Sequence, residues 1–292
     1  MRDTRLNISA GLASVSVATI LIIAKLWALG QTGSLSIAAS LADSGMDLMI
    51  ALGGLMAIYY ASRPPDDDHA FGHTSAEDLA ALAQSAFILV SAAIIAVTST
   101  RRLLSTAPVE VQAEGAGIAV MVLSIVLTIA LVLWQRRVAR LTKSKVVSAD
   151  SLHYVGDLVP NIGAIVALFA AKAFGMHQID SVVALAAAGI LVVGALRIGK
   201  SAWDALMDRS APQDMIDNIE NMAKSYPEIH AFHDLKTRMA GSKPFVNIHI
   251  ELNGDQTLRE AHAISASLKH HIVTAYPNAD VIIHKDVWGE AD

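Results

Sequence analysis

The sequence predicts an α-helical membrane protein with six transmembrane helices, followed by a small α/β domain. The chain is 53% hydrophobic with a mean hydropathy of +0.46, and its composition becomes mixed and polar only after about residue 210. About 20 apolar residues suffice for a helix to cross a bilayer. The predicted spans cover approximately residues 8–30, 34–60, 79–100, 116–135, 146–173 and 179–203. We therefore divide the chain into a transmembrane domain, residues 1–208, and a second domain, residues 209–292.

Charge and cysteine content narrow the functional classes. The first 210 residues hold 15 Lys/Arg and 15 Asp/Glu, whereas the tail holds 7 and 12, so the net charge of −5 lies entirely in the tail. This acidity disfavours a nucleic-acid partner and is compatible with the handling of cations. The chain has no cysteine. Disulfides are therefore excluded, and a metal site would have to use His, carboxylate or water ligands.

Basic residues predict how the chain is oriented. With a cytoplasmic N-terminus, the predicted inner loops contain a basic cluster made of Arg136, Arg137, Arg140, Lys143 and Lys145. The predicted outer loops contain only Arg101, Arg102 and Lys172. The positive-inside rule then places both termini in the cytoplasm of a multi-pass protein of the cell inner (plasma) membrane. Lys25, near the outer end of the first span, is expected to snorkel toward the interface.

Two motifs place ionisable side chains inside predicted spans. The second span contains Asp43 and Asp47, and the fifth contains His153 and Asp157. Each pair is four residues apart, so its members share one helix face. Ionisable groups in a membrane are costly and usually face a partner, an ion or water. A hydrogen-bonded interhelical contact would explain one buried Asp, but two neighbouring carboxylates repel each other unless something positive compensates them.

Depth counting connects the two motifs. At about 1.5 Å per residue, Asp43 lies about 14 Å from the outer end of its span, and Asp157 about 16 Å from the inner end of the fifth span. In a core of about 30 Å these residues are level, and Asp47 is level with His153. Three carboxylates and one imidazole form a four-ligand set suited to tetrahedral Zn²⁺. Asp150, nearer the inner mouth, is expected to be an entrance or capping residue rather than a ligand.

The two motifs, the Ala-Asp-Ser-Leu-His-Tyr stretch around His153, the six spans and the tail together resemble the cation diffusion facilitator family. The resemblance covers nearly the whole chain and is closest to the family's bacterial zinc-transporting, proton-coupled branch. It implies a homodimeric antiporter, not an enzyme, that exports a divalent metal from the cytoplasm in exchange for protons and needs no organic cofactor. An imidazole at position 153 is typical of zinc and cadmium members, whereas manganese members more often lack it.

The predicted inner loop after the second span contains another His/Asp group. Asp66, His69 and His73 have a spacing compatible with a surface metal site, although a solvated acidic loop ending in a helix cap is the alternative. The resemblance assigns metal binding to these three residues. Relatives commonly have a Lys at the position of Ser75. The charge pair that such a Lys could form with the acid at the membrane edge, here Asp208, is therefore in question.

The tail is expected to be a ferredoxin-like, metallochaperone-like α/β domain. Its predicted elements are a helix over 212–225, strands over 232–239 and 245–252, a helix over 257–275 and a strand over 280–286. Strand alternation places His249 on the face opposite Ile248 and Ile250. The resemblance matches five tail residues to a regulatory zinc cluster at the dimer interface: His233, His249, His262, His284 and Asp286.

Other functions remain possible at this stage. An exporter of Fe²⁺, Cd²⁺ or Mn²⁺ would use the same scaffold and differ only in the ion. A divalent-metal channel would need a continuous pore and would not couple to protons. A membrane metalloenzyme would need an open coordination position and a nearby base, and the chain has no HExxH motif. The sequence favours a Zn²⁺/proton antiporter that works as a homodimer in the lipid bilayer.

Overall fold

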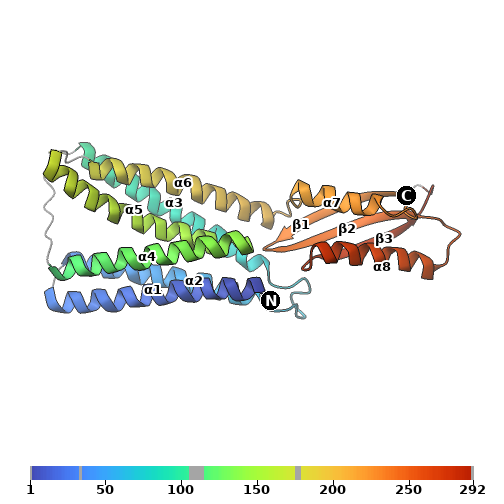
Figure 1. The fold of residues 1–292 in the computed structure, drawn as a ribbon, viewed down its shortest axis with the longest axis horizontal. Coiled ribbons are helices and arrows are strands. Elements are labelled where there is room, and N and C mark those ends of the chain that lie inside the picture. The colour runs from blue at the N-terminus through green and yellow to red at the C-terminus, as the bar shows by residue number, and fades with distance from the viewer. Residues whose placement is uncertain (1, 33–34, 105–114, 175–178, 291–292) are drawn as a thin grey trace. The chain divides into compact units, whose positions relative to one another are not determined.

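A computed structural model describes residues 2–32, 35–104, 115–174 and 179–290 (Figure 1). The chain divides into two compact units, Met1–Trp203 and Asp204–Asp292, and each unit is described by itself below. The first unit is entirely helical in its described residues, and the second combines helices with a sheet.

Six long helices build the first unit. They are α1 (Arg2–Thr32), α2 (Leu35–Ala61), α3 (Ser75–Leu104), α4 (Gly115–Thr142), α5 (Lys145–Phe174) and α6 (Ile179–Leu206). Within the described residues, five of them (α1, α2, α3, α4 and α6) are long and apolar enough to cross a membrane by length and composition. The remaining one, α5, has 30 residues and measures about 45 Å, enough to cross a bilayer. The predicted architecture of six transmembrane helices followed by a small α/β domain is confirmed.

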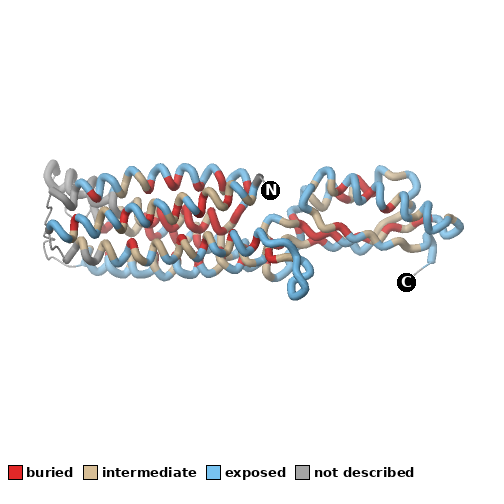
Figure 2. Tube along the Cα trace, turned by 90° about the horizontal axis from the view of Figure 1, so that it is seen from below, coloured by how far each residue is buried: buried red, intermediate tan, exposed pale blue. Residues whose placement is uncertain are grey.

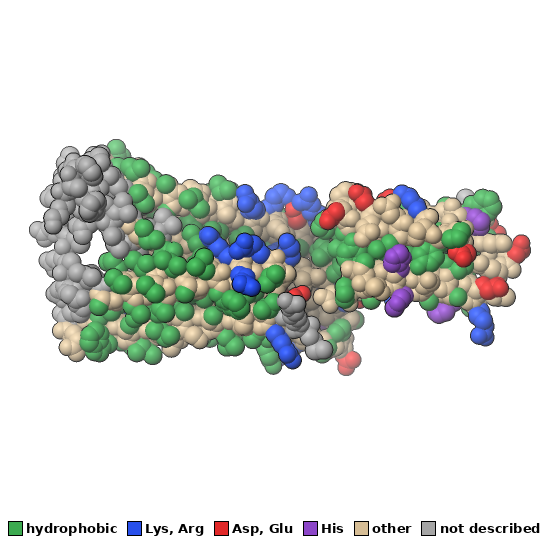
Figure 3. Space-filling model, viewed as in Figure 1, with side chains coloured by type: hydrophobic (Ala, Val, Ile, Leu, Met, Phe, Trp, Pro, Cys, Tyr) green, Lys and Arg blue, Asp and Glu red, His purple; other side chains and the backbone are tan. Residues whose placement is uncertain are grey.

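The surface of the helical unit is apolar, as a membrane requires. Large side chains such as Trp27, Ile94 and Val126 are exposed, and Figure 3 shows hydrophobic side chains over much of the visible face. Lys and Arg side chains gather at the end of the bundle that carries the N-terminus (Figures 1 and 3). A soluble protein would not expose this much apolar surface. The distribution therefore fits helices that face lipid along most of their length.

Small residues allow the helices of this unit to approach closely. Buried and exposed positions alternate along each helix (Figure 2), and Ala10, Ala81 and Ala202 are fully buried. At Gly194 of α6, an added Cβ would lie 2.7 Å from Leu152 Cδ2 of α5, so only glycine fits there without a shift. Small residues at helix contacts are characteristic of membrane bundles, because the close packing itself holds the helices together.

A buried ion pair connects α3 to α5. The Lys145 Nζ lies 2.7 Å from Oδ1 of Asp78, whose side chain is only 1% exposed. Lys145 is the first residue of α5, and Asp78 lies in the first turn of α3. The pair thus joins helices that are distant in sequence at the bundle end that carries the basic residues.

The second unit is an α/β fold with a three-stranded sheet. Its elements are α7 (Gln213–Lys224), β1 (Ala231–Ala240), β2 (Lys243–Leu252), α8 (Leu258–Ala275) and β3 (Asp280–Val287). The strand order is β1-β2-β3, with β1 antiparallel and β3 parallel to the central β2. The parallel pair requires a crossover connection, which α8 supplies. A capping box between Thr257 and Glu260 fixes the start of α8.

The core of the second unit lies between the helices and one face of the sheet. Alternate residues of β2 are buried, including Ile248 and Ile250, and pack with Ile219 of α7 and Leu268 of α8. His249 lies between the two isoleucines and therefore points to the opposite face. α7 and α8 do not cover this opposite face of the sheet. It carries the histidines discussed below.

Replacement of a core residue of β2 should destabilise the second unit. Ile250 is 0% exposed, so Ile250→Ala should cost about 2–5 kcal/mol by leaving a cavity. Ile282→Ala is the matched control, because Ile282 of β3 is 58% exposed. Thermal unfolding of the purified full-length protein, followed by circular dichroism, should show a clear loss only for the first variant. Equal losses would contradict the assignment of this core.

Candidate metal centres

Three ionisable side chains of α2 and α5 meet inside the helical unit. The His153 Nε2 lies 3.0 Å from Asp47 Oδ1 and 3.9 Å from Asp157 Oδ2. One possible ligand atom from each residue lies within 4.8 Å of the others. We call Asp47, His153 and Asp157 the membrane triad. His153 and Asp157 stand one turn apart on α5, so the α-helical repeat itself aims both at α2.

The imidazole of the membrane triad is largely enclosed. His153 is 8% exposed, and the rings of Phe87 and Tyr154 lie 5.9 and 5.6 Å from its own ring. The Asp157 side chain is 42% exposed. The triad therefore combines an enclosed nitrogen donor with a carboxylate whose Oδ2, the atom that faces His153, is buried as well.

Asp43 is not part of the membrane triad. It lies one turn before Asp47 on α2, it is exposed, and no set of grouped ligand atoms in the described residues includes it. The neighbouring residues of α2 instead receive Lys25 of α1, whose Nζ donates to the Ser40 carbonyl at 3.0 Å and to Ser44 Oγ at 2.6 Å. Lys25 thus bonds to α2. The sequence predicts instead that its side chain extends toward the membrane interface.

The loop between α2 and α3 forms a second group, the loop triad, from Asp66, His69 and His73. Asp66 Oδ1 lies 3.1 Å from His69 Nδ1, and Asp66 Oδ2 lies 3.1 Å from His73 Nε2. The two imidazole rings are 4.6 Å apart. Gly72, at a φ of +91°, makes the turn that brings His73 back toward Asp66. All three predicted loop residues therefore come together.

Hydrogen bonds prepare Asp66 to be an anion. Partial desolvation alone would raise the pKa of its carboxyl, but the backbone N–H of His69, which donates at 2.7 Å, and the His69 ring outweigh that effect. The pKa of Asp66 is therefore below its ordinary value. Its ionised oxygens are the form that binds metal cations.

Three histidines form a row across the sheet of the second unit. His233 of β1 is directly opposite His249 of β2, which is in turn opposite His284 of β3. The neighbouring rings lie 5.1 and 4.6 Å apart. Strand register alone produces this row, since residues opposite each other on adjacent strands point to the same face. We refer to these three residues as the histidine row.

Asp286 of β3 holds the histidine row together. Its Oδ2 lies 2.9 Å from His249 Nδ1 and 3.6 Å from His233 Nε2, and its Oδ1 lies 2.7 Å from His284 Nδ1. Partial desolvation alone would raise its pKa, but the hydrogen bonds with His249 and His284 prevail and lower the pKa below its ordinary value. Three imidazoles around one ionised carboxylate make a set of N and O donors typical of zinc sites.

His262 does not join the histidine row in its own chain. It is exposed on α8, and α8 packs through Leu268 and Ile272 on the other face of the sheet. A single copy of the domain cannot bring an α8 side chain to the row without unpacking that core. Glu251 takes a place that the sequence did not predict, with its Oε1 3.3 Å from His233 Nδ1.

The carboxylate of Asp208, just after α6, pairs with an arginine of the second unit. Asp208 Oδ1 accepts a hydrogen bond from Arg238 Nη1 of β1 at 3.0 Å. Asp208 itself adopts a φ of 55°, in the left-handed region, just after α6 ends. Ser75 is the first residue of α3. Within this chain, Arg238 therefore supplies the counter-charge for Asp208.

Sequence reasoning missed two polar contacts inside the helical unit. Lys25 bonds to α2 beside the Asp43–Asp47 motif, and Asp150 is buried with the amide of Gln135 rather than placed at an open mouth. A lysine and a glutamine in otherwise apolar spans were the available signals. Neither residue's partner could be identified without the packing of the helices.

The helical unit encloses a group of possible metal ligands between membrane-spanning helices, as expected of a membrane cation transporter. Comparison with known proteins gives the family. A family model described as the cation efflux transmembrane domain matches residues 11–207, and one described as the cytoplasmic domain of cation efflux proteins matches residues 211–287. The chain belongs to the cation diffusion facilitator family of cation-efflux transporters. It is a transporter rather than an enzyme.

Two cation-efflux pumps are similar to this chain over nearly its whole length. The cation-efflux pump FieF of Cronobacter sakazakii is 40% identical over 282 residues, which cover 97% of this chain and 93% of the relative. FieF of Klebsiella pneumoniae is 39% identical over the same share of each chain. A solved metal-bound C-terminal domain of the CzcD transporter from Thermotoga maritima is 26% identical and covers 27% of this chain and 94% of its own, with a TM-score of 0.27.

Proposed function

We propose that this protein is a Zn²⁺/proton antiporter that exports zinc from the cytoplasm by alternating access. It would act as a homodimer in the inner membrane, with both termini in the cytoplasm. Residues 1–208 would form the transport domain, and residues 209–292 a regulatory and dimerisation domain. The observation that carries the proposal is the membrane triad, in which donor atoms of two helices lie within 4.8 Å of one another.

The spacing of the triad supports metal coordination. In a tetrahedral site with zinc–ligand distances near 2.1 Å, two ligand atoms lie about 3.4 Å apart. The separations from His153 Nε2 are 3.0 Å to Asp47 and 3.9 Å to Asp157, on either side of that value. Small side-chain adjustments would therefore admit the ion. Asp43, one turn away on α2, would supply the fourth ligand after a change in its side-chain direction.

Competition for the same ligands would couple metal to protons. Carboxylate and imidazole lone pairs bind either a proton or a metal ion, so loading the metal releases protons. Three carboxylates and a neutral imidazole around Zn²⁺ give a net charge of about −1, which is tolerable in an apolar setting. An empty site with the same carboxylates would need protons in the place of the metal. An inward proton gradient could then drive metal outward.

The other two groups would sense cytoplasmic metal. The loop triad combines two imidazoles with a carboxylate, and His233 and His249 of the histidine row form such a group with Asp286. His262 is exposed on α8, so it could complete the cytoplasmic cluster only from a second copy of the chain. Zinc would then draw two second units together and report the cytoplasmic metal concentration to the transport domain.

Removal of Asp157 tests the transport site directly. Asp157→Ala should reduce proton-driven Zn²⁺ uptake into inside-out vesicles by about 100-fold or more, because the triad loses a ligand. Asp255→Ala, an exposed carboxylate of the second unit, is the control and should retain normal flux. Full zinc flux in Asp157→Ala would sink the assignment. Flux that ignores the proton gradient in the wild-type protein would favour a channel.

Replacement of His153 tests the choice of ion. His153→Asp should raise the transport of Mn²⁺ relative to Zn²⁺, because harder cations prefer carboxylate oxygen to imidazole nitrogen. Competition assays in proteoliposomes with Zn²⁺, Fe²⁺, Cd²⁺ and Mn²⁺ would measure the change. An unaltered Zn²⁺/Mn²⁺ ratio would count against direct coordination by His153. Preference of the wild-type protein for Fe²⁺, Cd²⁺ or Mn²⁺ would replace zinc as the substrate.

Metal removal tests the cytoplasmic cluster. Adding Zn²⁺ to the chelated full-length protein should raise its thermal stability, by about 2.7 kcal/mol at a concentration 100 times the dissociation constant. His249→Ala should lose most of this gain, because His249 is central in the histidine row. His270→Ala, on the exposed surface of α8, should keep it. Equal stabilisation of both variants would show that the row does not hold the metal.

A further inference from the structure

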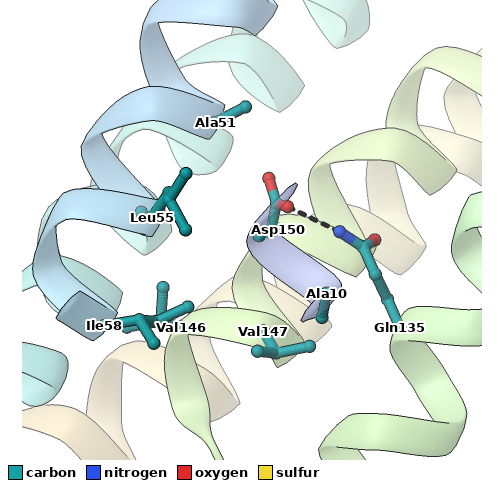
Figure 4. A pocket seen from close by; sticks show the side chains of 10 residues that line it. Ala10, Ala51, Leu55, Ile58, Gln135, Val146, Val147 and Asp150 are labelled. Carbon is teal, nitrogen blue, oxygen red and sulfur yellow. Dashed lines mark hydrogen bonds between the residues drawn. The ribbon is translucent and has the colours of Figure 1, made fainter. Parts of the chain in front are cut away.

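A small cavity lies within the helical unit, next to a buried carboxyl (Figure 4). Its volume is about 10 Å³, close to the minimum for one water molecule. The lining comes from the inward faces of four helices: Ala10 and Gly11 of α1, Ala51, Gly54, Leu55 and Ile58 of α2, Gln135 of α4, and Val146, Val147 and Asp150 of α5. The only ionisable side chain among these ten residues is Asp150.

Asp150 and Gln135 each have one satisfied and one unsatisfied polar atom. The amide Nε2 of Gln135 donates to Asp150 Oδ2 at 2.6 Å, drawn as the dashed line in Figure 4. Within the described residues, Asp150 Oδ1 and Gln135 Oε1 are buried and form no hydrogen bond. Asp150 is 6% exposed and Gln135 is 0% exposed. A carboxyl aimed at an apolar cavity with one free oxygen is an expensive place for a full negative charge.

The neighbours of Asp150 do not neutralise it by direct contact. Ser14 of α1 is near enough for its hydroxyl to interact with Asp150, and the same hydroxyl lies 3.1 Å from the Tyr154 hydroxyl, to which it donates. The charged groups nearest to it are His153 on its own helix and Asp47 on α2, both members of the membrane triad. Among the described residues, no ion pair includes Asp150. Its direct hydrogen-bond partner, the Gln135 amide, is neutral, so no ionic contact stabilises a full negative charge on this carboxyl.

We propose that Asp150 is a proton-binding site outside the metal ligands: it holds a proton while the membrane triad is empty and releases it when the triad binds a divalent cation. This inference rests on the proposed antiport function. It adds a second binding site for the exchanged proton, besides the ligands of the membrane triad, for which protons and metal compete. The bound cation and the proton on Asp150 would exclude each other through charge, without sharing a ligand atom.

Distance and charge provide the coupling. Asp150 precedes His153 by three residues on α5, so their Cβ atoms lie about 5–6 Å apart. A divalent cation at the triad would stabilise the ionised carboxylate in this low-dielectric setting, where charges act strongly on one another. The O–H bond at Asp150 then breaks, the proton passes to a water molecule, for which the cavity has just enough room, and the electron pair stays on the carboxylate. When the cation departs, the carboxylate takes up a proton again.

Gln135 suits both forms of such a carboxyl. Its N–H stabilises the ionised form, as it does at Oδ2, and its Oε1 can accept the O–H of the protonated form, directly or through a water molecule in the cavity. A Lys or Arg at this position would fix the carboxyl as an anion, and an apolar residue would fix it as an acid. The amide therefore leaves Asp150 free to change state.

Proton counting on the full-length protein tests the inference. Calorimetric titration with Zn²⁺ in buffers of different ionisation enthalpy gives the number of protons released per bound ion. Asp150→Asn should release about one proton fewer than the wild type while still binding Zn²⁺. Thr128→Val, a buried substitution on α4 away from the cavity, should match the wild type. An unchanged proton count in Asp150→Asn would overturn the inference.

Infrared difference spectroscopy gives a second readout that does not require a substitution of Asp150. Zinc addition to the wild-type protein should remove the carbonyl-stretch band of a buried, protonated carboxyl, and Gln135→Leu should shift the frequency of that band. Gln135→Leu should also move the pH of half-maximal transport upward, because the anion loses its N–H donor. Absence of both effects would overturn the inference even if Asp150→Asn failed to fold. Failure of the wild type to exchange Zn²⁺ for protons would instead reject the antiport function.

Discussion

Every ionisable side chain inside the helical unit has to find its partner within the protein, because hydrocarbon offers neither hydrogen bonds nor counter-ions. This constraint organises the interior. Lys25 bonds to α2, Lys145 pairs with Asp78, and His153 lies between Asp47 and Asp157. The first two contacts join helices that are otherwise held by small apolar residues. The third gathers atoms of the kinds that also bind metals, so the same rule that holds the bundle together assembles the membrane triad.

The second unit reaches a comparable donor set through sheet geometry. One face of β2 is committed to the core by Ile248 and Ile250, so His249 has to point away from it. Pairing on both sides then places His233 and His284 beside His249 without any further device. A shift of one residue in either pairing would turn a histidine toward the apolar core, where burial of its polar ring without a hydrogen-bond partner is unfavourable. The histidine row is therefore as well specified as the hydrophobic core.

Sequence periodicity was sufficient for the elements of the tail and for the i,i+4 pairs of the two membrane motifs. The tail strands and helices begin and end within two residues of their predicted limits, since alternation and caps define them locally. The i,i+4 spacing predicted the pairs on α2 and α5. Depth counting placed Asp43 level with Asp157 but could not set the direction of its side chain, which is exposed in this structure. Likewise, no local pattern reveals that α8 and His262 lie across the sheet from the histidine row.

The bonds made by Lys25 have a mechanical consequence. One ammonium holds a carbonyl and a hydroxyl of α2 that are a full turn apart, at 3.0 and 2.6 Å. Sliding α1 along α2 would require Lys25 to reorient or to give up one of these bonds. These two hydrogen bonds therefore link α1 directly to α2. While both bonds persist, a displacement of α2, which carries Asp47, also moves α1.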